Sequence, residues 1–343
     1  MKSNLSIDSR KDEHLIINSR KDVNSSNTTG LEKFRLIHSA LPEINLSDVD
    51  PSGELFGKKF SIPLMISSMT GGTKKAGELN RILAISAQKF GLAMGVGSQR
   101  IGIEKAESMK TFKIRKFAPD IAIFSNLGAV QLNYGFSLDD CKKLIDSINA
   151  NALILHLNPL QEALMENGNT NYFGLLNKIE YTCKNLEVPV IVKEVGWGIS
   201  AQVAKNLFDA GVQAIDVAGA GGTSWSEVEK HRLNNPSGKR IAHGFRDWGI
   251  PTAEALIEIR KELPHILLFS SGGIKTGLDV VKSIALGANM VGMARKFLIT
   301  AMKSQNDLDE LIIEIANQIK ITMFAIGVKE IGDISSNHIK RIN

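Results

Sequence analysis

The stretch DVAGAGGTSW, residues 216–225, is a glycine-rich turn that follows a short apolar run at 214–217. A second glycine turn, Ser271-Gly272-Gly273-Ile274, follows another apolar run at 266–269. Glycines just past strand ends let backbone N–H groups approach an anion, because no Cβ intervenes. For either turn alone, a tight strand-to-helix connection is an equal alternative. The pair late in the chain favours a flavin or nucleotide phosphate site in a barrel.

The chain from Pro63 onward alternates short apolar runs with longer amphipathic stretches. Eight short runs have the character of buried strands: Leu64–Ser67, Leu92–Val96, Ile121–Ser125, Leu153–His156, Val190–Lys193, Ala214–Val217, Ile266–Phe269 and Met290–Gly292. Helical patterns separate them: Lys75–Lys89, Leu138–Asn149, Ser200–Ala210, Thr252–Glu262 and Leu278–Leu286. Alternating strands and helices predict parallel βαβ units. Eight units predict an α/β fold of the closed (β/α)8 TIM-barrel type, with a last helix at about 307–326 outside it.

The predicted barrel domain spans residues 31–343, and residues 1–30 form a Ser/Asn-rich segment without apolar periodicity. We expect this segment to be a mobile arm. The triplet Arg10-Lys11-Asp12 recurs in it as Arg20-Lys21-Asp22, and composition alone favours a solvated tail. Long loops at 158–171 and 226–249 follow the fourth and sixth strands, at the rim where barrels carry catalytic groups.

The composition is that of an ordinary globular protein, with 43% hydrophobic and 22% charged residues and a net charge of +5. Its lysines and arginines are scattered, so we expect no nucleic-acid partner. The first thirty residues are polar, and the longest uncharged run, 121–138, is too polar to span a bilayer. Cys141 and Cys183 adjoin no motif and suit a reducing compartment. We therefore expect a soluble, cytoplasmic protein.

Polar residues follow most of the predicted strands. They are Ser67–Thr70, Ser98–Arg100, Asn126, His156, Asn158, Gln161, Glu162, Lys193 and Glu194. The carboxyl rim of one barrel can hold all of them within reach of one ligand.

Lys193 is the most informative of these residues, because an unpaired lysine at the end of an apolar strand is costly to bury. Close to a flavin it would stabilise negative charge on the reduced ring. A salt bridge with Glu194 is the alternative.

Glu162 is a candidate ligand for Mg²⁺, which takes one or two carboxylates together with phosphate oxygens. Arg100 and Arg10-Lys11 supply the cations that a diphosphate needs.

These motifs together resemble the type 2 isopentenyl-diphosphate isomerases, a family of FMN-dependent (β/α)8 enzymes. The resemblance extends over nearly the whole chain in the family's order. It is carried by 10–14 (RKDEH), 34–38 (FRLIH) with 40–43 (ALPE), 69–72 (MTGG), 97–100 (GSQR), 156–162 (HLNPLQE), 193–196 (KEVG), 219–225 (GAGGTSW), 248–252 (WGIPT) and 271–274 (SGGI). Each motif is short and weak alone, whereas all of them in register are specific.

The resemblance implies an isomerase of isoprenoid biosynthesis that interconverts isopentenyl and dimethylallyl diphosphate by a 1,3-allylic proton shift. It implies reduced FMN, kept reduced by NAD(P)H, together with Mg²⁺ and a tetrameric or octameric homo-oligomer. A cationic transition state over the electron-rich reduced flavin would gain most from electrostatic stabilisation in a dry site.

The resemblance also implies roles for individual residues. FMN would contact Ser67, Ser68, Met69, Thr70, Ser98, Asn126, Lys193, Thr223, Gly272, Gly273, Ile274, Lys275, Ala294 and Arg295. The substrate would contact Arg10, Lys11, Ser98, Gln99, Arg100, Asn158 and Gln161, and Glu162 would bind Mg²⁺. The implied catalytic set is Gln161, Glu229, His156 and Trp225. For Trp225 and Glu229, a core position and a solvated helix face are the alternatives.

One departure and two rival functions accompany this interpretation. The second basic triplet, at 20–22, stands where the family is less basic, so it is an alternative to Arg10-Lys11. An FMN-dependent oxidase of 2-hydroxy acids would use a histidine base and an arginine clamp, and His243 with Arg246 offers both. A flavin-binding barrel without catalysis is the second rival.

Overall fold

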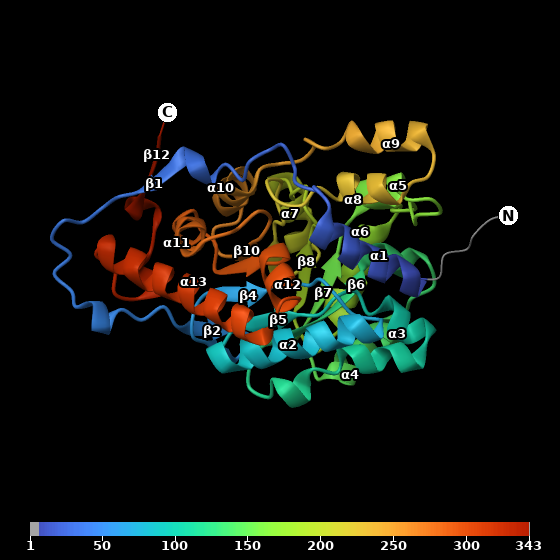
Figure 1. Cartoon of the computed structure of the whole chain (residues 1–343), viewed down its shortest axis with the longest axis horizontal. Helices are drawn as coiled ribbons and strands as arrows, with labels where there is room; N and C mark the ends of the chain where they lie inside the picture. Colours follow the sequence, from blue (N-terminus) through green and yellow to red (C-terminus); the bar gives the residue numbers. More distant parts are fainter. Residues whose placement is uncertain (1–6, 343) are drawn as a thin grey trace.

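The computed structural model describes residues 7–342, with side chains from Glu13 onward. This part of the chain forms a closed barrel of eight parallel strands surrounded by helices (Figure 1), which confirms the predicted fold. The barrel strands are β4 (Leu64–Ile66), β5 (Ala93–Gly95), β6 (Ile123–Gly128), β7 (Ala152–His156), β8 (Val190–Lys193), β9 (Ala214–Asp216), β10 (Leu267–Ser270) and β11 (Met290–Met293). Each predicted strand overlaps one of them.

Apolar side chains fill the inside of the barrel and the layer between its strands and the helices. Along β4, Leu64 and Ile66 pack outward beneath the helices, whereas Met65 belongs to the inner cluster. A hairpin of β2 (Gly53–Leu55) and β3 (Lys58–Phe60) adds Leu55 and Phe60 to that inner cluster. Each fully buried side chain of this kind contributes roughly 1.5–3 kcal/mol. The hairpin thereby closes the end of the barrel opposite the carboxyl rim.

The outer layer consists of helices that follow the strands in sequence. They are α2 (Lys74–Phe90), α3 (Arg100–Glu104), α4 (Leu138–Ile148), α5 (Pro159–Leu164), α6 (Leu175–Asn185), α7 (Ala201–Asp209), α8 (Trp225–Arg232), α9 (Pro236–His243), α10 (Thr252–Glu262), α11 (Gly277–Ala285), α12 (Arg295–Ala301) and α13 (Gln305–Ala325). Capping boxes at Ser137 and Thr276 fix the starts of α4 and α11. The predicted last helix is α13, which packs on α2 and α11. No helix among the described residues is both long and apolar enough to cross a membrane.

The two ends of the barrel domain meet in a small sheet. Strand β1 (Phe34–Leu36) pairs antiparallel with β12 (Ile339–Arg341). No strand was predicted near residue 340, because three residues without an apolar run carry too little periodicity.

The first thirty residues require a correction, because helix α1 (Ile7–Arg20) occupies a segment for which no regular structure was predicted. It packs against α8 and α12 (Figure 1). Ile17 in the helix and Val23 just beyond its end are buried together with Val228 of α8. The few apolar residues of this helix are bunched, so their face becomes apparent only when α8 covers it. The side chains of Arg10 and Lys11 lie outside the described residues.

Candidate active site

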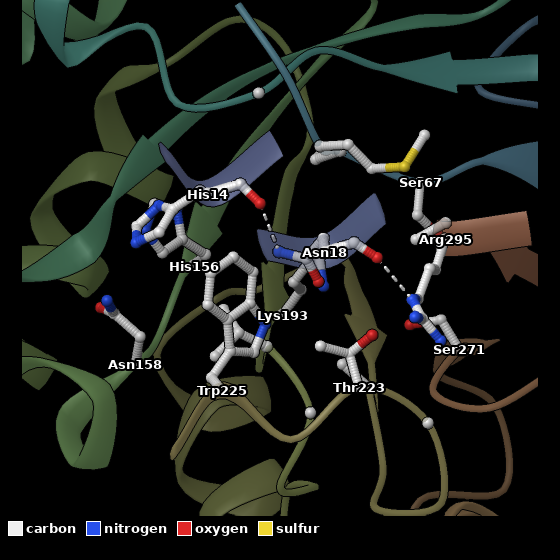
Figure 2. A pocket seen from close by; sticks show the side chains of 18 of the residues that line it. His14, Asn18, Ser67, His156, Asn158, Lys193, Thr223, Trp225, Ser271 and Arg295 are labelled. Atoms are coloured by element: carbon white, nitrogen blue, oxygen red, sulfur yellow. Dashed lines mark hydrogen bonds between the residues drawn. The ribbon is translucent and has the colours of Figure 1, made fainter. Parts of the chain in front are cut away.

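A cavity of about 600 Å³ opens at the carboxyl end of the barrel. Figure 2 shows α1 crossing it, with a hydrogen bond that joins the backbone oxygen of Asn18 to Arg295. Most predicted site residues line this cavity: Ser67, Ser68, Met69, Thr70, Ser98, Arg100, Asn126, His156, Asn158, Gln161, Glu162, Lys193, Thr223, Trp225, Gly272, Gly273, Ile274, Lys275, Ala294 and Arg295. Residues from loops far apart in sequence therefore converge on one space, as the barrel rim requires.

The two glycine turns pack directly against each other. Gly273 has a φ of +76°, and a Cβ there would lie 2.5 Å from the carbonyl oxygen of Gly221. A Cβ on Gly222 would lie 2.6 Å from the backbone nitrogen of Gly273. Neither turn accepts a side chain, so the sequence needs glycine in both. This mutual packing next to the cavity favours the interpretation of the pair as a phosphate cradle.

Two serine hydroxyls point to a polar ligand at the end of β4. Ser67 Oγ and Ser68 Oγ are buried, yet neither has a hydrogen-bond partner within the described part of the chain. Both residues line the cavity. Buried hydroxyls are normally satisfied, so these two are suited to a bound molecule with carbonyl, amide or phosphate oxygens. A flavin mononucleotide has all of these groups.

Lys193 is the last residue of β8 and is only 7% exposed. Its ammonium donates a hydrogen bond of 2.6 Å to the backbone oxygen of Glu194. It also lies 4.0 Å from Asp216 Oδ2, and Asp216 is its direct neighbour in the β8–β9 ladder. The cation is therefore held at the cavity wall, where it can face a bound ligand.

The alternative of a Lys193–Glu194 carboxylate pair is not what the structure contains. Glu194 Oε2 instead accepts the backbone N–H groups of Val195, Gly196 and Trp197, at 2.6, 2.7 and 2.6 Å. Burial raises the pKa of Glu194 to about 7, against the opposing effect of these three donors. Glu194 therefore fixes the turn after β8, and its backbone fixes the lysine.

Amide side chains link helix α5, which follows β7, to helix α8. Asn158 Nδ2 donates to Gln161 Oε1 and to Glu162 Oε1, both at 3.1 Å. Gln161 Nε2 then donates to Glu229 Oε1 at 2.9 Å. His156 Nδ1 lies 2.8 Å from Asn126 Oδ1, which fixes the orientation of its ring. The predicted polar residues thus form a network with defined donors and acceptors.

Glu229 is 1% exposed, which excludes the solvated-face alternative, although it does not line the cavity itself. His14 Nε2 lies 3.1 Å from Glu229 Oε1, and Arg232 Nη1 lies 2.5 Å from Oε2. Burial raises the pKa of Glu229, but the hydrogen bond and charge of His14 and the charge of Arg232 outweigh it and lower that pKa to about 2. The carboxylate is therefore ionised at neutral pH.

Glu162 is a single buried carboxylate with both oxygens already engaged. Oε2 accepts the backbone N–H of Asn169 at 2.6 Å, in addition to the Asn158 contact at Oε1. Among the described residues, no group of three His, Cys, Asp or Glu side chains could hold a metal. The site therefore fits Mg²⁺ only where a phosphate and water supply most of the ligands.

Gln99 is a predicted substrate contact that the structure does not bring to the cavity. It is fully buried, with Oε1 accepting from Ser125 Oγ at 2.6 Å and Nε2 directed to the carbonyl oxygen of Leu144 at 3.3 Å. Its neighbour Arg100 does line the cavity and pairs with Glu104 at 2.7 Å. Gln99 therefore holds the loop from which Arg100 projects.

Arg295, a predicted FMN contact, is bound to the end of α1. Its guanidinium donates to the carbonyl oxygen of Asn18 at 2.8 Å and to Asn24 Oδ1 at 2.9 Å (Figure 2 shows the first). A further bond of 3.3 Å reaches the carbonyl oxygen of Lys21. The arginine thus joins the barrel rim to the helix that crosses the cavity.

His243 and Arg246, the residues of the rival oxidase interpretation, do not line the cavity. His243 Nδ1 lies 2.7 Å from Glu227 Oε1, and Arg246 Nη2 lies 3.1 Å from Asp22 Oδ2. The second basic triplet thus contributes Asp22 to an ion pair away from the cavity. Neither residue can act as the base or the clamp of an oxidase from this position.

Sequence reasoning assigned no role to several residues that border the cavity. His14 stands edge-on to Trp225, with ring centroids 5.3 Å apart. Asn18 and Asn24 belong to α1 and the segment after it, and Gln131 follows β6. Only His14 carried a signal in the sequence, through its place beside the first basic triplet.

The chain matches the FMN-dependent dehydrogenase family over residues 158–341. It is 52% identical over 320 residues to a Nostoc sp. protein named isopentenyl-diphosphate delta-isomerase, covering 93% of this chain and 91% of that one. A Rickettsia africae protein of the same name is 47% identical over 337 residues, covering 98% of each chain.

Solved structures resemble the chain in fold at low sequence identity. A flavocytochrome b2 variant superposes with a TM-score of 0.71 at 17% identity, covering 96% of this chain and 82% of that one. A mandelate oxidase variant with a monooxide FMN adduct gives a TM-score of 0.64 at 19% identity, covering 96% and 91%. At such identities the likeness establishes the fold alone.

Proposed function

This chain belongs to the FMN-dependent isopentenyl-diphosphate delta-isomerases, and we propose that the cavity under α1 is its active site. There it would interconvert isopentenyl and dimethylallyl diphosphate. The observation that carries the proposal is the Gln161–Glu229 hydrogen bond, which places an ionised carboxylate beside a cavity that already holds a glycine cradle and Lys193. An allylic proton shift needs a proton acceptor next to the cofactor.

We propose that FMN lies with its phosphate on the turn at 272–275 and Ala294, and with its ring against 67–70 and Asn126. The unpartnered hydroxyls of Ser67 and Ser68 support this placement. Lys193 would face the edge of the ring that carries negative charge after reduction. When bound, reduced FMN supplies an electron-rich surface and a nitrogen able to exchange a proton. The reductant in this proposal is NAD(P)H.

The diphosphate of the substrate would lie toward Ser98 and Arg100, and Arg10 and Lys11 are proposed as further contacts. Glu162 would hold Mg²⁺ together with diphosphate oxygens, because one carboxylate is insufficient by itself. Asn158 orients Glu162 and Gln161 through its amide. Gln99 would act indirectly, by supporting the loop of Arg100.

The reaction moves the double bond from C3–C4 to C2–C3, so C4 gains one proton and C2 loses one. We place Glu229 as the acceptor of a proton, because its carboxylate is ionised and anchored by His14 and Arg232. Gln161 donates its amide hydrogen to that carboxylate and would align it with the substrate. Trp225 and His156 would close the cavity against water. Water exclusion strengthens every charge interaction in the site.

We further propose a cytoplasmic homo-oligomer, a tetramer or an octamer. Exposed apolar side chains on α6 and the loop before it support association. Phe173 is 94% exposed, Tyr181 59% and Leu176 40%. Apolar groups gathered on one element are typical of subunit interfaces.

The test is anaerobic turnover of isopentenyl diphosphate by the purified protein with FMN, dithionite and Mg²⁺ in D₂O. Deuterated dimethylallyl diphosphate that forms only with reduced flavin is the expected result. A flavin that is instead bleached by a 2-hydroxy acid, with no isomerised product, would overturn the proposal in favour of an oxidase. FMN binding without either reaction would identify a non-catalytic barrel.

A further inference from the structure

Asp216 is a buried carboxylate that the proposed chemistry does not use. It ends β9, is 1% exposed, and does not line the cavity. Oδ1 accepts the hydroxyl of Ser271 at 2.6 Å and the backbone N–H of Ala218 at 3.2 Å. Oδ2 has no hydrogen-bond partner among the described residues. A buried carboxylate oxygen left in this way is costly unless a nearby charge compensates it.

The compensating charge is Lys193. Its ammonium lies 4.0 Å from Asp216 Oδ2, too far for a hydrogen bond but close enough for a strong Coulomb interaction in a buried site. The register of the β8–β9 ladder places the two residues directly opposite each other. The separation is therefore set by the barrel backbone and by the two donors on Oδ1, rather than by a flexible contact.

The ammonium of Lys193 has two oxygen neighbours, the backbone oxygen of Glu194 and the carboxylate of Asp216. One ammonium hydrogen goes to the backbone oxygen of Glu194, and the ammonium also borders the cavity. The negative charge of the Asp216 carboxylate, whose Oδ2 lies 4.0 Å from this ammonium, partly offsets the positive charge of Lys193 without a hydrogen bond to it. A ligand in the cavity thus experiences a lysine whose field is reduced by a fixed counter-charge.

We infer that Asp216 is a positioning residue that moderates the pull of Lys193 on reduced FMN. The inference rests on the proposed placement of FMN against Lys193. A fully uncompensated cation would draw electron density from the reduced ring and would stabilise its anion strongly. A moderated cation holds the ring while leaving it electron-rich, which a cationic transition state requires. Ser271 takes part indirectly, because its hydroxyl shares the charge on Asp216.

The measurable quantity is the ratio of the Kd for oxidised FMN to the Kd for reduced FMN. Asp216→Asn removes the counter-charge with little change of shape, and its amide oxygen can keep both donors. We expect that ratio to rise at least about tenfold, because reduced FMN gains more from the unopposed lysine. Ser271→Ala leaves the carboxylate without its hydroxyl donor, so we expect the ratio to fall.

A double-mutant cycle with Lys193→Met separates the inference from the proposed function. Lys193→Met should lower the ratio, and Asp216→Asn should have a smaller effect in that background than in the wild type, because the part of its effect that comes from holding the Lys193 ammonium in place is lost with the lysine. An equal effect of Asp216→Asn in both backgrounds, or no effect in the wild type, would overturn the inference. Should Asp216→Asn fail to fold, the Kd ratio of Ser271→Ala tests the inference in its place. A ratio that rises or stays unchanged in Ser271→Ala would overturn the inference. Turnover of isopentenyl diphosphate by the wild type tests the proposed function independently of these variants.

Discussion

Gln161 Nε2 donates a hydrogen bond of 2.9 Å to Glu229 Oε1, across 68 residues of sequence. The bond joins helix α5 to helix α8, and it connects two side chains of the implied catalytic set. The two side chains have different roles, because the amide of Gln161 does not ionise at neutral pH whereas the carboxylate of Glu229 is ionised. Gln161 orients the carboxylate through its hydrogen bond, and Glu229 carries the negative charge.

Replacement of Glu229 by Gln should lower kcat for isomerisation by about 10²–10⁴-fold, the usual range for loss of an acid–base group. FMN affinity should stay close to that of the wild type, because Glu229 does not line the cavity. Anaerobic kinetics and an FMN titration measure both. Glu227→Gln is the matched control, since Glu227 is equally buried on α8 but binds Lys230 and His243. Equal losses of kcat in the two variants would mean that α8 is merely destabilised.

The stability contribution of Glu229 should depend on pH in a defined direction. Its pKa is lowered from 4.5 to about 2 in the folded protein, so its ion pairs stabilise the fold above pH 4.5. That contribution, about 3 kcal/mol in full, is lost as the pH falls from about 4.5 to about 2. The difference in unfolding free energy between wild type and Glu229→Gln should shrink by about 2 kcal/mol between about pH 5 and pH 3. Chemical denaturation at several pH values measures it, and a constant difference would contradict the assigned ion pairs.

The barrel was predictable because every barrel strand is a short apolar run between helical patterns, and closure follows from counting the units. The identity of the rim residues was predictable for a related reason, since a polar residue just after an apolar strand must lie at the carboxyl end. Even so, the direction of a side chain at the rim is a local matter. Gln99 and Arg100 are neighbours, yet one turns into the protein and the other toward the cavity.

Features that depend on tertiary contacts were not predictable. Helix α1 has its apolar residues bunched at 15–17, and it is stabilised by α8 and α12 rather than by its own pattern. The proximity of His14 to Glu229 depends on that packing. The opposition of Asp216 to Lys193 depends on the register of two strands, which short apolar runs do not specify.

The glycine cradle predicts a selective loss of FMN binding. Gly273→Ala would introduce a Cβ against the Gly221 carbonyl oxygen at a φ of +76°, so the two turns must separate. We expect FMN affinity to fall at least about tenfold. The left-handed backbone of the alanine should separately lower the stability of the fold by roughly 1 kcal/mol. Gly135→Ala is the control for backbone strain, with a φ of +90° and nothing within 4 Å of the added Cβ. Fluorescence titration of FMN into both variants compares them, and equal affinities would argue against a cradle.

Glu162 predicts the metal dependence of the reaction. In Glu162→Gln, the Mg²⁺ concentration for half-maximal activity should rise by about 10–100-fold, because an amide is a poorer ligand for a hard cation. FMN affinity should be unchanged. Glu166→Gln, an exposed acidic position just after α5, supplies the control. An unaltered Mg²⁺ response in Glu162→Gln would show that the diphosphate binds the metal without this carboxylate.

Arg295 distinguishes a cofactor contact from an anchor for α1. Its guanidinium donates to the carbonyl oxygens of Asn18 and Lys21, so Arg295→Met should loosen the attachment of α1 to the barrel rim. His14, which α1 holds beside the cavity, should then be less well positioned. We expect KM for isopentenyl diphosphate to rise about tenfold, the value of one or two charge-assisted hydrogen bonds, with a smaller change in FMN affinity. Arg260→Met is the control, because Arg260 also binds backbone carbonyls, at Leu263 and Gly287, but far from the cavity. A loss of FMN affinity with an unchanged KM would instead assign Arg295 to the FMN phosphate, and α1 would then depend on other anchors, such as the ion pair of Glu13 with Arg232.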